Sequence, residues 1–182
     1  FEFTKYVKYN PKEEIPVIRG LNIGKNGFIP GDYKFIDRKT LEILPRSRLK
    51  GKEILMVFVG SVGNVAIVPS DKEYFLGPNV AKININIKRL NNQYVEYYLR
   101  SIHGQNYISK LAKSTTQSSI SMENIRTIKL AIPSPHIQDL IVQEIEKQFT
   151  RLDESVKSLK DVKRKLEIYR KSVLKYAFIS KK

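Results

Sequence analysis

Short apolar runs separated by glycine and proline fill residues 1–90. Runs of this length, rich in β-branched and aromatic residues, predict strands bounded by turns. The segment KININIK (82–88) alternates strictly, with isoleucine on one face and asparagine on the other, which predicts a half-buried strand. GSVGN (60–64) lies between two apolar runs and predicts a tight hairpin. The predicted strands are IPVIRG (15–20), YKFI (33–36), ILMVFVG (54–60), NVAIVP (64–69) and KININIK.

Helical spacing replaces the strand pattern at residues 91–103. Tyr94, Tyr98 and Ile102 fall on one face, and Gly104 is expected to end this helix. QNYISKLA (105–112) predicts a second, short helix, and TIKLAI (127–132) predicts a strand that returns to the sheet.

One long helix is predicted to follow. Ser134 and Pro135 suit the N-cap and first helical position, and no proline or glycine occurs from residue 136 to the end. At about 1.5 Å per residue the helix would be roughly 65 Å long. The alternative is a helix lying along its own domain, which would use only its first turns, so the pattern favours a coiled coil. The apolar positions form two heptad runs that meet at a three-residue stammer: Ile145, Phe149, Leu152, Val156 and Leu159, then Val162, Leu166, Tyr169, Val173 and Tyr176.

These patterns predict an α+β protein with two parts. Residues 1–133 form a mixed, β-rich globular domain, and residues 134–182 form one long helix that pairs in a coiled coil. An unpaired apolar stripe of this length would expose more apolar surface than a monomer tolerates, so we expect the chain to form a homodimer through this helix.

The net charge of the chain indicates what kind of partner it binds. The net charge is +15, and residues 1–136 carry 21 Lys and Arg against 11 Asp and Glu. An excess of this size within a globular part favours binding to a polyanion, although a lysine-rich composition alone could also produce it. The chain has no cysteine and no apolar run long enough to span a bilayer, which suits the cytoplasm. It begins with Phe1, which is typical of a fragment of a longer protein.

Candidate catalytic chemistry is weak. GLNIGKN (20–26) is too short for a phosphate-binding loop and has asparagine where a hydroxyl is needed. His103 and His136 are isolated from each other in the sequence. A metal-dependent nuclease would have to use Asp32, Asp37 and Lys39, whose spacing is poor. We therefore predict a non-catalytic chain, with a coiled-coil interaction module of incidental charge as the alternative to a DNA-binding protein.

Three loops combine cations with amide and hydroxyl side chains, the groups that contact phosphates and base edges. RSRLKGK (46–52) supplies four cations in seven residues, and RGLNIGKNGF (19–28) places polar side chains on glycine-rich turns. The polar run KSTTQSS (113–119) precedes the long helix. For Gln117 and Ser119 an inward, bracing role is an equal alternative. The predicted DNA-binding residues are Arg19, Asn22, Lys25, Asn26, Arg46, Arg48, Lys50, Lys113, Thr115, Thr116, Gln117 and Ser118.

The second half of the chain contains a T-x-Q-x-x-I segment, a strand ending in proline, a helix start with Gln and spaced Ile and Val, and an S-[IV]-L-x-x-A-F helix end. With these motifs the chain resembles, over nearly its whole length and most specifically from Ser114 onward, the specificity subunit of type I restriction–modification systems. IPVIRG and GSVGN also resemble its N-terminal strands. Two departures are His136 or Ile137 in place of an acid before Gln138, and the absence of the glycine common after the helix end. The matching positions are Thr116, Gln117, Ile120, Pro133, Gln138, Ile141, Val142, Ile145, Ser172, Val173, Leu174, Ala177 and Phe178.

The resemblance implies a function and partners. A chain with one recognition domain and one such helix would be a half-length subunit or half of a full one. It would read one half of a bipartite target in double-stranded DNA. It would dock the methyltransferase (modification) subunits, with a restriction/translocase subunit joining indirectly. No cofactor is expected in this chain, because S-adenosylmethionine, Mg and ATP would be bound by the partner subunits.

Overall fold

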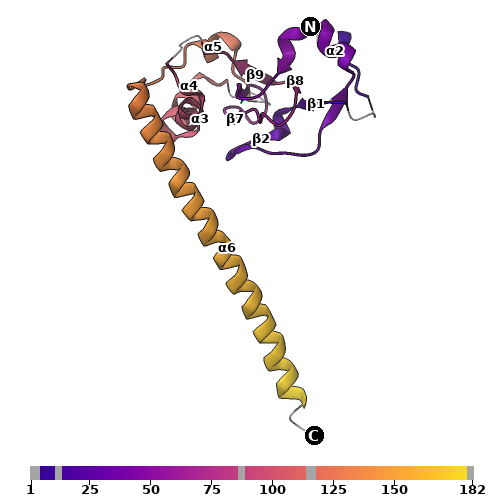
Figure 1. Ribbon diagram of the computed structural model, residues 1–182, viewed down its shortest axis with the longest axis vertical. Helices are drawn as coiled ribbons and strands as arrows, with labels where there is room; N and C mark the ends of the chain where they lie inside the picture. Colours follow the sequence, from indigo (N-terminus) through magenta and orange to yellow (C-terminus); the bar gives the residue numbers. More distant parts are fainter. Residues whose placement is uncertain (1–4, 11–13, 86–88, 114–117, 180–182) are drawn as a thin grey trace. The chain divides into compact units, whose positions relative to one another are not determined.

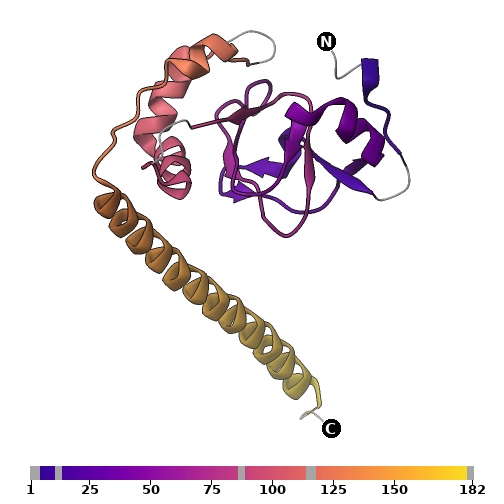
Figure 2. The same ribbon diagram turned by 45° about the horizontal axis from the view of Figure 1, so that its top comes forward.

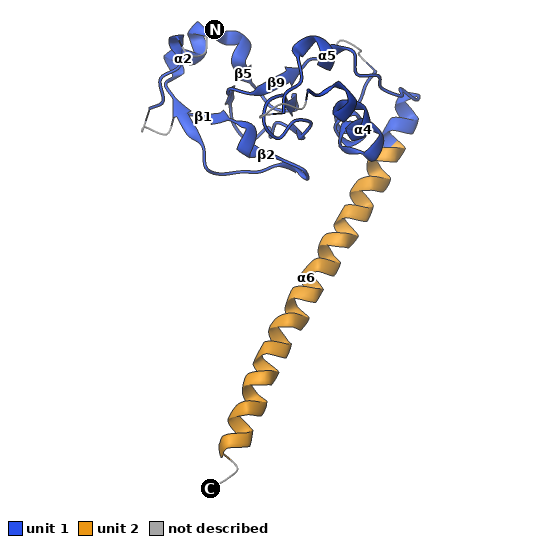
Figure 3. Ribbon diagram, turned by 180° about the vertical axis from the view of Figure 1, so that it is seen from behind, with its two compact units in different colours: residues 1–139 blue, residues 140–182 orange. Residues whose placement is uncertain are grey.

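The computed structural model describes residues 5–10, 14–85, 89–113 and 118–179. The chain divides into two compact units, residues 1–139 and residues 140–182 (Figure 3). Among the described residues, all strands and all short helices belong to the first unit (Figure 1).

Two sheets and a short hairpin form the β-part of the first unit. The larger sheet has the order β4-β1-β8-β5, in which β1 runs parallel to β8 and antiparallel to β4. The second sheet has the order β7-β6-β9 and is antiparallel throughout. The strands are β1 (Ile15–Ile18), β2 (Ile23–Gly24), β3 (Gly27–Phe28), β4 (Lys34–Ile36), β5 (Arg48–Leu49), β6 (Ile54–Val57), β7 (Val65–Ile67), β8 (Tyr74–Leu76) and β9 (Val80–Ile83).

The apolar runs of the sequence become the central strands because both of their faces are covered. All four residues of β1 and all four of β6 are buried. One core cluster joins Ile18, Leu55 and Tyr74, and another joins Ile15, Ile36 and Phe75. The predicted strands at 15–20, 33–36, 54–60 and 64–69 are therefore confirmed with shorter bounds, and GSVGN does connect the antiparallel strands β6 and β7.

Polar N-caps begin the helices that stand beside the sheets (Figure 2). The Asn91 side chain accepts hydrogen bonds from the amides of Gln93 and Tyr94, and Ser101 and Ser121 cap their own helices. The helices of the first unit are α2 (Arg38–Ile43), α3 (Asn92–Arg100), α4 (Ile102–Leu111) and α5 (Met122–Arg126), with 3-10 turns η1 (Gly20–Asn22) and η2 (Pro45–Ser47).

The expectation that Gly104 ends the first of these helices is wrong. The break falls at Ser101, whose backbone is extended and whose Oγ accepts from the Gly104 amide at 3.3 Å. A Cβ on Gly104 would lie 2.3 Å from the Tyr98 carbonyl oxygen. Glycine is therefore needed inside α4, where its backbone approaches the end of α3.

Two predicted strands also differ. Residues 127–132 form no strand: Thr127 ends α5 in a helical turn conformation, and residues 128–132 have no regular secondary structure. Side chains of the helices bind this segment instead: the Tyr94 hydroxyl donates to the Ala131 carbonyl at 2.6 Å, and the Tyr107 hydroxyl donates to the Thr127 carbonyl at 3.4 Å. The strand predicted at 82–88 overlaps β9 (Val80–Ile83) only at residues 82 and 83; residues 84 and 85 belong to no strand, and residues 86–88 lie outside the described residues.

The long helix α6 (Pro135–Ile179) has 45 residues, a length of roughly 68 Å at the standard rise. Its start at Pro135 agrees with the cap predicted at Ser134. Within the second unit the apolar positions from Phe149 to Tyr176 are exposed, and these positions include both predicted heptad runs beyond Ile145. The long helix is thus confirmed, whereas its pairing in a coiled coil stays a prediction.

Candidate nucleic-acid interface

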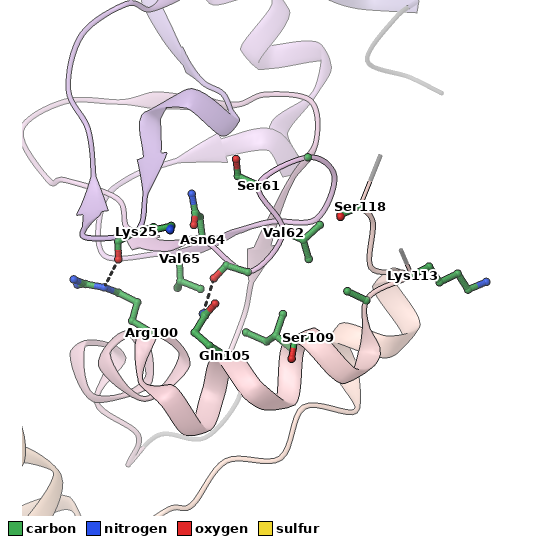
Figure 4. Close-up of a pocket in the computed structure, with 14 residues that line it drawn as sticks. Lys25, Ser61, Val62, Asn64, Val65, Arg100, Gln105, Ser109, Lys113 and Ser118 are labelled. Atoms are coloured by element: carbon green, nitrogen blue, oxygen red, sulfur yellow. Dashed lines mark hydrogen bonds between the residues drawn. The ribbon is translucent and has the colours of Figure 1, made fainter. Parts of the chain in front are cut away.

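A cavity of about 720 Å³ in the first unit is lined by four separate segments of the chain (Figure 4). They are the β2–β3 turn, the loop between β6 and β7, the end of α3 together with α4, and both flanks of the polar run. The described residues that line the cavity include three cations, Lys25, Arg100 and Lys113, and no carboxylate. Because Arg100 is paired with the buried Glu96, Lys25 and Lys113 carry the positive charge that suits an anionic ligand. The remaining lining residues are Gly60, Ser61, Val62, Gly63, Asn64, Val65, Gln105, Ile108, Ser109, Ala112 and Ser118.

The loop between β6 and β7 is held from two sides. The Gln105 side-chain amide donates to the Gly63 carbonyl at 2.9 Å and to the Leu99 carbonyl at 2.7 Å. Asn64 at the end of the loop donates to the Ile23 carbonyl at 2.9 Å. Gly63 has a φ of +87°, and a Cβ there would lie 3.1 Å from both Gln105 and Ile108, so glycine is required.

The base of the polar run is fixed to the same loop. Lys113 and Ser119 form an antiparallel bridge, with the Lys113 amide donating to the Ser119 carbonyl at 2.8 Å. Ser119 also bridges Val59, and the Gly60 amide donates to the Ser118 carbonyl at 2.9 Å. The backbone of Ser119 thus bonds to neighbouring segments, whereas the bracing role considered for Gln117 and Ser119 stays a prediction. Thr115, Thr116 and Gln117, which are predicted DNA-binding residues, lie outside the described residues.

The stretch from Arg19 to Phe28, which includes the β2–β3 turn at Lys25 and Asn26, exposes some of its predicted residues and buries others. Lys25 and Asn26 are exposed at the tip. Asn22 is fully buried: its Oδ1 accepts from the Arg19 amide at 3.0 Å, and its Nδ2 donates to the Gly31 carbonyl at 2.7 Å. The structure therefore gives Asn22 a bracing role. The Arg19 guanidinium donates to the Asp32 carbonyl at 2.8 Å and lies 3.8 Å from the Asp32 carboxylate.

A buried ion pair between Glu96 and Arg100 contacts the backbone of the β2–β3 turn. Glu96 on α3 is buried, and its Oε1 accepts from Arg100 Nη1 at 2.8 Å. Burial raises the pKa of Glu96, although the adjacent Arg100 guanidinium opposes this shift. Arg100 Nε donates in turn to the Lys25 carbonyl at 3.3 Å (Figure 4).

The basic stretch at 46–52 forms a separate group that does not line the cavity. Arg48 Nε donates to Glu73 at 2.7 Å, and Arg38 donates to the same carboxylate at 3.1 Å. The hydrogen bond from Arg48 lowers the pKa of Glu73. Arg46 and Lys50 are exposed. Part of the charge that the sequence offers for phosphate contact is thus neutralised within the protein.

The structure brings together three of the predicted residues in one cavity: Lys25, Lys113 and Ser118. Ser61, Ser109 and Arg100 line the same cavity and are not among the residues predicted from the sequence. The spacing of Glu96 and Arg100, four residues apart on a helix, is the one signal in the sequence that could have marked Arg100.

The carboxylates considered for a nuclease have other partners. The Asp37 carboxylate accepts from the Asn10 amide, and Asp32 lies beside Arg19. In the described parts of the chain, no group of three or more His, Cys, Asp or Glu side chains could hold a metal ion. Over the same residues, none of the helices combines the length and the apolar character that crossing a membrane requires.

Comparisons with known proteins agree on one family. The family described as "Type I restriction modification DNA specificity domain" matches residues 2–167. The Type I restriction enzyme EcoBI specificity subunit of Escherichia coli is 23% identical over 167 residues, which are 92% of this chain and 35% of that protein. The chain therefore spans about a third of the length of this curated relative.

One solved structure shows the same fold. A chain in a structure describing complex assembly and conformational transition of the type I R-M system matches 93% of this chain and 40% of its own length. Its TM-score is 0.71 and its identity 15%. The type I S subunit from M. genitalium matches 82% of this chain and 42% of its own, with a TM-score of 0.49 and 19% identity.

Proposed function

We propose, since this chain belongs to the family of type I restriction–modification DNA specificity domains, that it reads one half of a bipartite target in double-stranded DNA. Residues 1–133 are the target-recognition domain in this proposal. The observation that carries it is the cavity in which Lys25, Lys113 and Ser118 meet from loops far apart in the sequence. Cations for phosphates and hydroxyl and amide groups for base edges are the components of sequence readout.

The polar run has a defined place in this proposal. Its two flanks line the cavity, and hydrogen bonds to residues 58–60 fix its base. Residues 113–119 therefore supply a DNA-contacting segment, and Thr115, Thr116 and Gln117 stay predicted contacts. Arg46 and Lys50 supply phosphate contacts at a second place, with Arg48 positioned by Glu73.

The chain itself catalyses no reaction in this proposal. S-adenosylmethionine, magnesium and ATP belong to partner subunits, and the methyltransferase subunit is the direct partner. A restriction or translocase subunit joins through it.

Residues 134–182 act as spacer and dock. Because this chain carries one recognition domain and covers about a third of the curated relative, two copies would supply two half-site readers. We propose an antiparallel homodimer through α6, whose exposed apolar positions in the second unit include Phe149, Leu159 and Tyr169. The alternative, a protein-interaction module with incidental charge, would leave the cationic cavity without a purpose.

Selection from a randomised duplex pool tests the proposal. The full chain, with and without the methyltransferase subunit, is expected to enrich one short sequence. Affinity for that duplex should fall with salt by about 0.9 log units per log unit of salt for each phosphate contacted. Enrichment of no sequence, or affinity independent of salt, would overturn the proposed function.

A further inference from the structure

Arg100 connects a buried carboxylate to the exposed turn that carries two predicted DNA contacts. Its Nη1 lies 2.8 Å from Glu96 Oε1, and its Nε donates to the Lys25 carbonyl at 3.3 Å. Its guanidinium also lies 5.7 Å from the centre of the Tyr97 ring. A single planar group is therefore oriented by three partners, one of which belongs to the β2–β3 turn.

The carboxylate that holds Arg100 is itself held. Glu96 is buried, and its Oε2 accepts from the Gln93 side chain at 3.2 Å. The Arg100 side chain is only 16% exposed, so this ion pair is largely withdrawn from solvent. Breaking a buried ion pair leaves an uncompensated charge, and the free-energy cost of that charge holds Arg100 and Glu96 together.

The turn is built to lie close to this pair. Gly27 has a φ of +106°, which favours glycine, and a Cβ there would lie 3.5 Å from both Arg100 Nη1 and Glu96 Oε1. Lys25 and Asn26 precede Gly27 and are exposed. The backbone of the turn thus meets the ion pair while its side chains remain available to a ligand.

We propose that Arg100, oriented by Glu96, is a positioning residue that fixes the β2–β3 turn and so sets the sequence preference of the chain through Lys25 and Asn26. The proposal rests on the DNA-reading function proposed above and adds a residue that acts through another segment. Its role differs from that of a phosphate contact, since it concerns discrimination between sequences more than total affinity.

The decisive variant is Arg100→Lys, which keeps the charge but replaces the planar, multi-donor group with a single ammonium. Discrimination between the enriched duplex and a scrambled duplex is expected to fall at least about fivefold, the lower end of what one good base contact contributes. Affinity for the scrambled duplex and its salt slope should stay unchanged. Lys110→Met, on the exposed side of α4, serves as the control that changes charge alone.

A second variant keeps the proposal testable if Arg100→Lys fails to fold. Glu96→Gln is nearly isosteric and removes a negative charge, so simple attraction predicts tighter DNA binding. The proposal instead predicts lost discrimination, the same direction as for Arg100→Lys. Combining Arg100→Lys with Asn26→Ala should lose less discrimination than the two single changes together, because both act through one turn.

The outcomes separate this inference from the proposed function. If the unaltered chain enriches no sequence, the proposed function itself fails. If it enriches a sequence that Arg100→Lys and Glu96→Gln discriminate equally well, the positioning role is overturned. If Arg100→Met weakens all duplexes alike and lowers the salt slope by about 0.9 while discrimination persists, Arg100 is a phosphate contact instead.

Discussion

Replacing Gln138 should destabilise the first unit, because this fully buried side chain ties the first turn of α6 to the segment before α3. Its Oε1 accepts from the Asn91 amide at 2.8 Å. Its Nε2 donates to the Pro133 carbonyl at 2.9 Å and to the Arg89 carbonyl at 3.3 Å. Gln138→Met keeps the volume and removes all three hydrogen bonds.

The expected loss is roughly 3 kcal/mol in the free energy of unfolding, since each neutral hydrogen bond contributes about 1 kcal/mol. This is a large share of the roughly 5–15 kcal/mol that stabilises a typical domain. Urea denaturation followed by the near-ultraviolet circular dichroism of tyrosine would measure it, because the chain has no tryptophan.

Gln143→Met provides the matched control, since Gln143 is an exposed glutamine on the same helix. It should change the free energy of unfolding by no more than about 0.5 kcal/mol. Equal effects of the two substitutions, or a loss below about 1 kcal/mol for Gln138→Met, would show that the Gln138 hydrogen bonds do not stabilise the first unit.

Four further predictions follow from the same structure. Arg46→Gln and Lys50→Gln should each weaken every duplex alike and lower the salt slope by about 0.9, measured by fluorescence anisotropy; a change in sequence preference would contradict a phosphate role. Gln105→Glu removes both donors that hold the loop between β6 and β7 and should cost roughly 2 kcal/mol in urea denaturation; an unchanged midpoint would count against this clamp. Sedimentation should give a species heavier than 21.1 kDa, and Leu159→Lys should return it to the monomer; a monomeric unaltered chain at micromolar concentration would remove the proposed pairing. The folded-state pKa of Glu96 lies above its ordinary 4.5, so the stability that Glu96 contributes is present below pH 4.5 and is lost as pH rises through the folded pKa. The free energy of unfolding of the unaltered chain minus that of Glu96→Gln should therefore fall from pH 4 to 7. A rise in this difference would contradict the raised pKa.

Local patterns predicted the elements whose environment is uniform along their length. The β6 run ILMV is buried on both faces, so its continuous apolar character was sufficient evidence. The same holds for α6, where the absence of proline and glycine and the heptad spacing extend over the whole element.

Contacts between residues far apart in the sequence determine the features that local sequence patterns did not predict. Arg48 appears as one of several free cations in the sequence, but Glu73, which is 25 residues away, accepts its hydrogen bonds. Asn22 has a side chain suited to base edges, but its Nδ2 donates a hydrogen bond to the Gly31 carbonyl, nine residues away, and so braces the protein internally. The cavity itself arises because four distant segments meet, and no pattern along the chain specifies such a meeting.

The structure of this chain bound to its selected duplex would show whether the cavity is the DNA-contacting surface. We expect the DNA to cover the cavity, with Lys25, Lys113 and Ser118 within hydrogen-bonding distance of phosphates or base edges. A complex in which the DNA lies elsewhere and the cavity faces solvent would contradict the account.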